Sequence, residues 1–377
     1  YESAPNSTDL TWETVITKNI GLDLGFLNNR LNVSFDAYIR DTKDMLMAGK
    51  TLPGVYGASS PRMNVADLRT KGWEASVTWG DSFTLASKPF NYRIMAGIGD
   101  NTSKVTKYDN PNRTLTDPYE GQQLGEIWGY VVDGYFKTDE EARNYKVDQS
   151  FVNQMINASA LDNGLHAGDL KFVDLDGNNK IEQTTSANDR KDMKVIGNSL
   201  PRYNYNFGIS ADWYGIDFSV LFQGIGKQNW YPGAETSMFW GPYSRPYASF
   251  IPSDFMSQVW SEENTNAYFP RPRGYVALGS NRELAVVNTK YLQNLAYCRL
   301  KNLSIGYTLP DKWLSKIGFE KIRVYFSGEN LLTFTKLPSD YIDPEQASAS
   351  NSWKTSKSDA NIYPWAKTYS FGVDITF

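Results

Sequence analysis

Oxygen-bearing side chains alternate along residues 174–182, which read Asp-Leu-Asp-Gly-Asn-Asn-Lys-Ile-Glu. Asp174, Asp176 and Asn178 occupy positions one, three and five of a calcium-loop spacing, and the backbone carbonyl of Lys180 falls at position seven. Hard oxygen ligands at alternate positions converge on one ion because the loop coils around it. The spacing therefore predicts a site for calcium or a similar cation, with a structural rather than a catalytic role.

The same stretch departs from the calcium-loop pattern at two places. Gly177 stands at position four instead of position six, and Thr185 at position twelve lacks the closing carboxylate. Glu182 would contribute at position nine, and Asp189, displaced by an insertion, would close the loop. A turn held by its own Asp and Asn side chains is the alternative interpretation, and the sequence leaves both open.

An aromatic run further along is the second candidate for ligand contact. Flat rings stack on sugar faces, and they also anchor contacts between proteins. The candidates for contact with a ligand or a lid protein are Trp230, Tyr231, Phe239, Trp240, Tyr243 and Tyr247. Packing of these rings against their own loop is the alternative.

The composition argues against bond-making or bond-breaking chemistry. The chain has one histidine, His166, and one cysteine, Cys298, so a His-based metal site, a Ser–His–Asp triad and an internal disulfide framework are not expected. A glycosidase needs two carboxylates placed across a sugar, and no acidic pair in the chain is singled out for that role. The net charge of −4 makes nucleic acid an unexpected partner. We therefore predict a protein that is not an enzyme.

The elements that would position these loops are strands, and the pattern is clearest at the end of the chain. Tyr369, Phe371, Val373, Ile375 and Phe377 alternate with small or polar residues. A period of two indicates a strand with one apolar and one polar face. A strand of this kind that ends on Phe resembles the last strand of a bacterial outer-membrane barrel, so these five residues are predicted to form the barrel-assembly signal.

About nine such strands of about ten residues follow one another along the chain, which is the length that crosses a bilayer at a tilt. The connectors at 28–29, 80–89, 213–215 and 310–320 are short, and those at about 48–65, 103–202, 227–293 and 333–364 are long. Outer-membrane barrels alternate short periplasmic turns with long outer loops in this way. The sequence predicts an all-β transmembrane antiparallel barrel whose remaining strands lie upstream of residue 1.

Several sequence blocks resemble one family, the SusC/RagA-type TonB-dependent outer-membrane transporters of Bacteroidota. They cover nearly the whole chain, 1–377, in the order and spacing of the C-terminal part of that family's barrel. The blocks are Asp9-Leu-Thr-Trp-Glu13, Asn19-Ile-Gly-Leu-Asp-Leu24, Asn29-Arg-Leu31, Tyr38-Ile-Arg-Asp-Thr-Lys-Asp-Met-Leu46, Lys71-Gly-Trp-Glu74, Gly168-Asp-Leu-Lys-Phe-Val-Asp174, Ile196-Gly-Asn-Ser-Leu-Pro-Arg-Tyr203, Leu300-Lys-Asn-Leu-Ser-Ile-Gly-Tyr-Thr-Leu-Pro310, Gly328-Glu-Asn-Leu-Leu332 and the terminal Phe377.

The resemblance implies a barrel of about 22 strands, with a plug domain and a TonB-contacting segment outside this chain. It also implies a bacterial outer-membrane location, assembly by the barrel assembly machinery and import of a large nutrient, most often an oligosaccharide and in some members a peptide. A SusD-like lipoprotein would cover the barrel from outside. The one cofactor that we consider is the structural calcium indicated by the spacing of the Asp174 loop. The rival interpretation is a secreted β-rich protein that binds or cleaves glycans.

Overall fold

The computed structural model describes residues 10–49, 54–57, 60–153, 164–244, 251–272, 275–279, 282–314, 318–347, 357–358 and 363–377. Within these residues, nine strands form one antiparallel sheet in the order β1-β2-β3-β4-β9-β10-β13-β14-β16. The strands are β1 (Thr14–Phe26), β2 (Leu31–Ala48), β3 (Arg62–Leu85), β4 (Lys88–Lys107), β9 (Arg202–Trp213), β10 (Ile216–Lys227), β13 (Tyr297–Thr308), β14 (Lys321–Thr335) and β16 (Thr368–Thr376). The predicted chain of hairpin-connected strands is confirmed.

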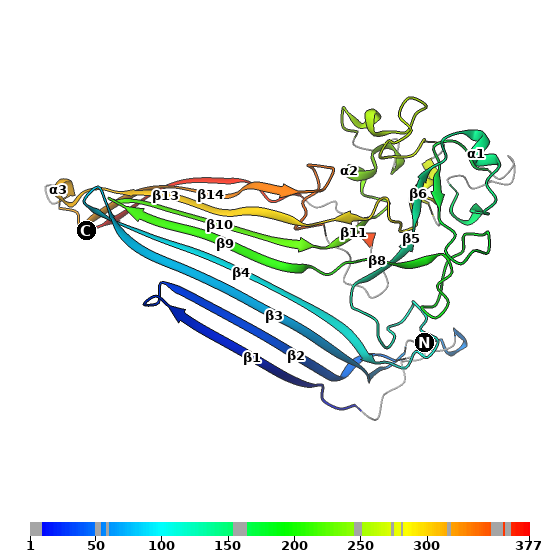
Figure 1. The fold of residues 1–377 in the computed structure, drawn as a ribbon, viewed down its shortest axis with the longest axis horizontal. Helices are drawn as coiled ribbons and strands as arrows, with labels where there is room; N and C mark the ends of the chain where they lie inside the picture. The colour runs from blue at the N-terminus through cyan, green and yellow to red at the C-terminus, as the bar shows by residue number, and fades with distance from the viewer. Residues whose placement is uncertain are drawn as a thin grey trace.

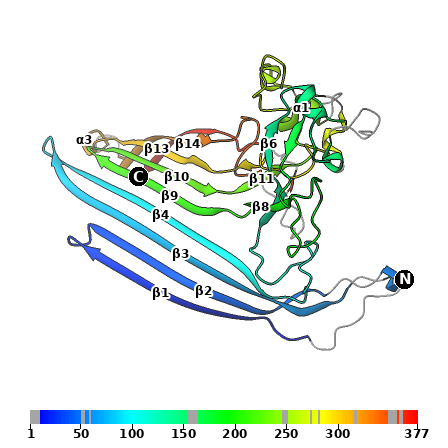
Figure 2. The same ribbon diagram turned by 45° about the vertical axis from the view of Figure 1, so that its right-hand side comes forward.

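The connectors alternate between the two ends of this sheet, as Figures 1 and 2 show. The tight turn after β3 is formed by Ala86 and Ser87 and the one after β9 by Tyr214 and Gly215, all with positive φ. A turn with two positive φ values matches the twist of a hairpin. The short connector between β13 and β14 carries α3 (Asp311–Leu314), which follows Pro310 as expected. The expected connector at 80–89 is shorter than predicted, because the paired strands continue to Leu85 and from Lys88.

The long connectors gather at the other end, where those at 108–201 and 228–296 form a separate body that we call the loop body (Figure 1). Its strands are β5 (Glu126–Tyr130) with β8 (Met193–Asn198), β6 (Val132–Tyr135) with β7 (Leu170–Phe172), and β11 (Asn229–Pro232) between β12 (Gln293–Asn294) and β15 (Lys357–Ser358), the last from the β14–β16 connector. Its helices are α1 (Asp139–Arg143) and α2 (Ser237–Trp240). Short 3-10 turns lie at Gly54–Tyr56, Ser150–Val152, Gly241–Tyr243, Phe255–Gln258 and Tyr275–Leu278.

The strand register separates an apolar face from a polar face. One row across the first strands contains Leu22, Phe35, Ala75, Ile98 and Tyr205, and the adjoining row contains Gly21, Asp36, Glu74, Gly99 and Asn204. The apolar face is widely exposed, for example at Ile20 (72%) and Phe371 (83%). Such an extended apolar surface is unfavourable in water. These rows are not buried face to face within the described residues, so a compact sandwich is not the architecture.

Three tyrosines lie across the sheet over a glycine on the neighbouring strand. Tyr38 pairs with Gly72 and Tyr325 with Gly372, and in each case an added Cβ on the glycine would meet the phenol ring. Tyr205 covers Gly224 in the same way. Glycine leaves room for the ring, and the ring covers backbone that glycine would otherwise expose. These pairs fix the register between neighbouring strands.

The part of the chain that the structure describes contains no helix with the length and apolar character required to span a membrane.

Candidate functional site

The loop body is a packed unit with its own core. Buried aromatic and aliphatic side chains from both long connectors pack together, and residues of the β14–β16 connector join them. The largest fully buried members are Trp230, Trp240, Tyr231, Tyr291 and Phe172. Because a packed core resists local rearrangement, the two long connectors present a surface of fixed shape at this end of the sheet.

The predicted aromatic contact residues lie inside this core. The exposed fractions are 0% for Trp230, Tyr231 and Trp240, 3% for Phe239 and 2% for Tyr243. Polar atoms of three of these rings are satisfied internally: Tyr231 donates to the Leu284 carbonyl at 2.8 Å, Trp240 to that of Gly233 at 3.0 Å, and Tyr243 to that of Pro270.

Burial on this scale leaves no open ring face for a sugar or a partner. The five rings therefore have the packing role that we gave as the alternative, and the structure offers no support for direct contact by them. The sixth candidate, Tyr247, lies outside the described residues.

One polar residue that the sequence analysis missed organises this core. The buried Asn288 donates from Nδ2 to the Tyr231 hydroxyl at 2.8 Å and accepts at Oδ1 from the backbone N–H groups of Lys290 and Tyr291, both at 3.1 Å. A buried amide with these partners holds a chain reversal in place. No spacing rule marks an isolated Asn as buried.

The acidic loop brings together three carboxylates, of which two were predicted. One oxygen each from Asp174, Asp176 and Asp192 lies within 4.8 Å of the others. Asp174 accepts from the backbone N–H groups of Gly177 at 2.7 Å and Asn179 at 2.8 Å. These bonds are those of the self-held turn, yet carboxylate oxygens carry further lone pairs that remain available to a cation.

The other predicted ligands are directed elsewhere. Asn178 turns its amide nitrogen toward Asp176 and Glu182, both at 3.2 Å, and its oxygen accepts from the backbone of Lys180 at 2.8 Å. Glu182 pairs with Lys191 at 3.4 Å. The backbone carbonyl of Asp189 accepts from Thr184, and its carboxylate is not in the cluster.

Asp192 takes the place that we had expected Asp189 to fill. Its carboxylate is buried and accepts from the backbone N–H groups of Leu175 at 2.9 Å and Glu182 at 2.7 Å. Burial raises the pKa of Asp192, and the nearby charges of Asp176 and Asp174 raise the pKa further. A divalent cation among the three groups would oppose both effects. Asp192 reaches the cluster through the fold of the chain. A calcium loop of twelve residues that starts at Asp174 would end at Thr185 and would not include Asp192.

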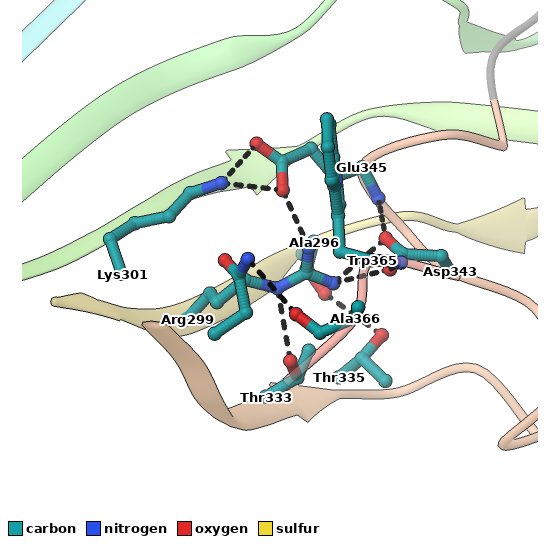
Figure 3. Close-up of polar contacts among 10 residues, drawn as sticks. Ala296, Arg299, Lys301, Thr333, Thr335, Asp343, Glu345, Trp365 and Ala366 are labelled. Atoms are coloured by element: carbon teal, nitrogen blue, oxygen red, sulfur yellow. Dashed lines mark hydrogen bonds and ion pairs between the residues drawn. The ribbon is translucent and has the colours of Figure 1, made fainter. Parts of the chain in front are cut away.

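A second ionic cluster joins the sheet to the β14–β16 connector (Figure 3). Arg299 on β13 contacts both carboxylate oxygens of Asp343 at 2.8 Å and Glu345 at 2.6 Å, and it donates to the Thr333 hydroxyl at 3.0 Å. The side chains of Arg299 and Asp343 are 3% and 4% exposed. The backbone N–H of Trp365 also donates to Asp343 at 3.1 Å. Asp343 and Glu345, in the first stem of the connector, contact Arg299 directly. Trp365, in the second stem, is linked to Arg299 through Asp343.

The polar face of the sheet contains an open trough of about 350 Å³. Its lining includes Asp36, Glu74, Ser76, Asn204 and Asn206, which come from β2, β3 and β9. Amide, hydroxyl and carboxylate groups suit a water-filled passage for a polar solute. The trough is the feature of this polar face that we connect with transport.

Four residues of the predicted assembly signal share the outward face of β16, and the fifth, Phe377, follows the strand directly. Ile375 pairs with Ile322, Val373 with Val324 and Phe371 with Phe326 on β14. The terminal Phe377 is 81% exposed, and its ring lies 5.1 Å from that of Phe319. The geometry presents an apolar row at the edge of the sheet. The signalling role of this row stays a prediction.

Together, the exposed apolar face, the polar opposite face, the two-residue turns at one end and the loop body at the other define a segment of an outer-membrane β-barrel. Residues 1–331 match the family model described as "TonB dependent receptor-like, beta-barrel", and the chain belongs to this family. The predicted family, fold class and outer-membrane location are thereby confirmed. Family membership also confirms that the chain is part of a receptor and not an enzyme.

Individual relatives with similar sequences or folds are longer than this chain. It is 28% identical to TonB-dependent receptor P3 of Formosa agariphila, over 98% of this chain and 34% of that protein. It is 24% identical to TonB-dependent receptor SusC of Bacteroides thetaiotaomicron, over 98% of this chain and 32% of that protein. The RagAB peptide importer in its 'open-open' state has a similar fold, with a TM-score of 0.69 at 22% identity, over 100% of this chain and 36% of that chain. The chain spans about a third of the length of these relatives.

Proposed function

We propose that the chain forms part of the wall and the outer loops of a TonB-dependent importer for a large polar nutrient, an oligosaccharide or a peptide. The polar trough beside an apolar lipid-facing surface is the observation that carries this proposal. Such a wall separates lipid from a hydrated lumen. The peptide importer among the similar folds supports a peptide, and the oligosaccharide is the class that the resemblance to the SusC/RagA family implies.

In the proposed mechanism, the loop body receives the nutrient, and the lumen admits it when a plug domain moves. Force for that movement would come from TonB through the plug, which lies outside the described residues, as do the other strands of a barrel of about 22. The residues of this chain would supply shape and hydration. The trough polar groups exchange hydrogen bonds with a passing solute and form no covalent bond with it.

The test compares two adjacent residues that face opposite sides of the wall. Ser76 lines the trough, whereas Val77 lies on the outward face and is 39% exposed. In the complete receptor, Ser76→Trp narrows the passage, and we expect uptake of a labelled oligosaccharide or peptide to fall severalfold. Val77→Trp places a large apolar ring in lipid and should leave uptake near the wild-type rate. Equal uptake by both variants, with normal surface levels, would contradict the transport role of the trough.

We further propose that a SusD-like lipoprotein contacts the top of the loop body. Ile251 lies before the Phe255–Gln258 turn, and Met256 lies within it. Both side chains are apolar, and their exposed fractions are 52% for Ile251 and 69% for Met256. Exposed apolar side chains on a packed body favour a protein contact. Met256→Glu should weaken co-purification of the lipoprotein, whereas the control Val195→Glu on β8 should not. Unchanged co-purification of the Met256 variant would exclude this contact.

We also propose a structural calcium ion between Asp174, Asp176 and Asp192, because their oxygens converge within 4.8 Å. Three carboxylates that converge without a cation repel one another. Calcium should slow proteolysis of residues 174–192, and a chelator should reverse this protection. Asp176→Asn should remove the calcium response without unfolding the loop, since it keeps the shape of the side chain. An equal rate of proteolysis with and without calcium would exclude the site.

A further inference from the structure

A group of lysines lies on the outward face of the sheet, where the apolar rows approach the long connectors. Lys18 on β1 and Lys71 on β3 both pair with Ile39 on β2, so the three side chains share the outward face. Directly paired residues of antiparallel strands point to the same side. Lys104 pairs with Arg69 in the next row, and Lys43 lies two rows beyond Ile39 on its own strand. We call Lys18, Lys43, Lys71 and Lys104 the lysine patch.

The lysine patch carries a net positive charge, although Asp41 interacts electrostatically with Lys18 and Lys43. All four lysines are exposed, and none makes an ion pair with another described residue. The nearby carboxylates are engaged already, since Asp41 binds Arg69 at 2.6 Å and Asp44 lies 4.0 Å from Lys107. Asp67 accepts from the backbone N–H of Asp44 at 2.9 Å. The patch is therefore a basic surface that can bind an anionic group outside the described residues.

The height of the patch is set by its neighbours along the strands. Trp73 lies on the same outward face of β3, two residues or about 6.6 Å from Lys71. Tryptophan marks the boundary between hydrocarbon and headgroups in membrane barrels. Below this boundary the outward row continues with Ala75 and Val77, and above it come Lys71 and Arg69. The lysine patch thus lies in the headgroup layer, on the side of the long connectors.

The lysine patch lies on one part of the wall. The outward rows of β10 and β14 approach the same end with Gly224, Gly226, Leu332 and Phe334, while Lys336 follows the end of β14 and Lys367 precedes β16. β1 to β4 form one edge of the described sheet, and Figure 2 shows them side by side. The four lysines of these adjacent strands therefore form one continuous basic surface.

We propose that the lysine patch binds phosphate groups of anionic lipid headgroups in the membrane leaflet that faces the long connectors. Phosphate groups occupy the layer directly above the hydrocarbon, where the four ammonium groups lie. An ammonium is a point charge suited to phosphate, and its aliphatic stem packs along apolar surface. Each lysine near an anionic membrane surface raises affinity by a factor of about five. This binding would hold a defined ring of lipid on β1 to β4 and does not depend on transport.

The test uses the complete receptor, purified in detergent with phosphatidylglycerol and phosphatidylcholine in equal amounts. Native mass spectrometry then counts the lipids that stay bound. The patch variant Lys18→Gln/Lys43→Gln/Lys71→Gln/Lys104→Gln is compared with a control of equal charge change at exposed positions of the loop body, Lys137→Gln/Lys146→Gln/Lys180→Gln/Lys194→Gln. We expect the patch variant to retain at least about tenfold less phosphatidylglycerol, with phosphatidylcholine unchanged and the control like wild type.

Equal retention of phosphatidylglycerol by wild type and patch variant would overturn the proposal. A variant that keeps its lipid but loses a co-purified acidic protein would also overturn it, because the counterpart would then be that protein. Heat-modifiable migration on a gel verifies that each variant forms a barrel. Should the fourfold variant fail this check, the pair Lys18→Gln/Lys71→Gln replaces it, with an expected loss of about fivefold or more.

Discussion

Replacement of Arg299 by Met should release the β14–β16 connector from the sheet. Arg299 and Asp343 are almost fully buried, and their two contacts of 2.8 Å leave no route for water to take the place of the arginine. Removal of one partner from a buried ion pair costs about 3–5 kcal/mol, because the remaining charge stays buried without compensation. The local opening equilibrium of the connector should therefore rise by roughly two to three and a half orders of magnitude.

Hydrogen exchange in the complete receptor measures this opening directly. The backbone N–H groups of Trp365 and Glu345 donate to Asp343 and report on the two stems of the connector. Both should exchange much faster in the Arg299→Met variant, whereas amides in β3 and β4 should keep their protection. Local exchange is the suitable readout because local and global opening have different free energies.

Lys301→Met is the matched control for this prediction. Lys301 binds Glu345 at 2.6 Å, but the two side chains are 21% and 23% exposed. A partly solvated pair of this kind contributes about 1 kcal/mol or less, so the exchange of Trp365 should change by less than about tenfold. The reasoning is refuted if Arg299→Met leaves both stem amides as protected as in wild type, or if Lys301→Met matches its effect.

Three further predictions concern assembly, register and the acidic loop. Gly72→Val should reduce the heat-modifiable barrel fraction severalfold because its Cβ would lie 2.5 Å from the Tyr38 ring; the double change with Tyr38→Ala should restore it, and no restoration would exclude a steric cause. Deletion of Phe377, or Phe377→Glu, should block outer-membrane insertion, and normal surface levels would remove its signalling role. The calcium response of the acidic loop should weaken as the pH falls through the raised pKa of Asp192, since the protonated carboxyl no longer binds the ion; a pH-independent response would exclude Asp192 as a ligand.

The strands and their faces were predictable because their pattern is local. A period of two appears in the sequence wherever one face meets lipid and the other meets water, as between Leu31 and Ile39. Turn positions were predictable to within a few residues. The connector expected at 80–89 was too long, since Phe83 and Phe90 continue the pairing to a tight turn. Strand ends are less certain because alternation weakens beyond the membrane.

The candidate sites were only partly predictable. The spacing of Asp174 and Asp176 identified an acidic loop, but Asp192 reaches them from a separate turn. The aromatic run indicated contact of some kind, and the sequence left open whether Trp230 and Trp240 contact a ligand or lid protein or pack against their own loop. Burial at 0% answers this question for both rings. The burial of these two rings depends on residues from two connectors, and the sequence pattern does not show how the connectors pack together.

By itself, the amino-acid sequence determined the all-β membrane architecture, because lipid on one side and water on the other imposes an alternation that each strand carries alone. The tertiary structure decided which long-range groups meet. Arg299 contacts Asp343, which lies 44 positions away in the sequence. Lysines on β1, β2, β3 and β4 form one patch only after the strands pair in register. Such contacts arise from strand order, register and connector packing, which are properties of the folded chain as a whole.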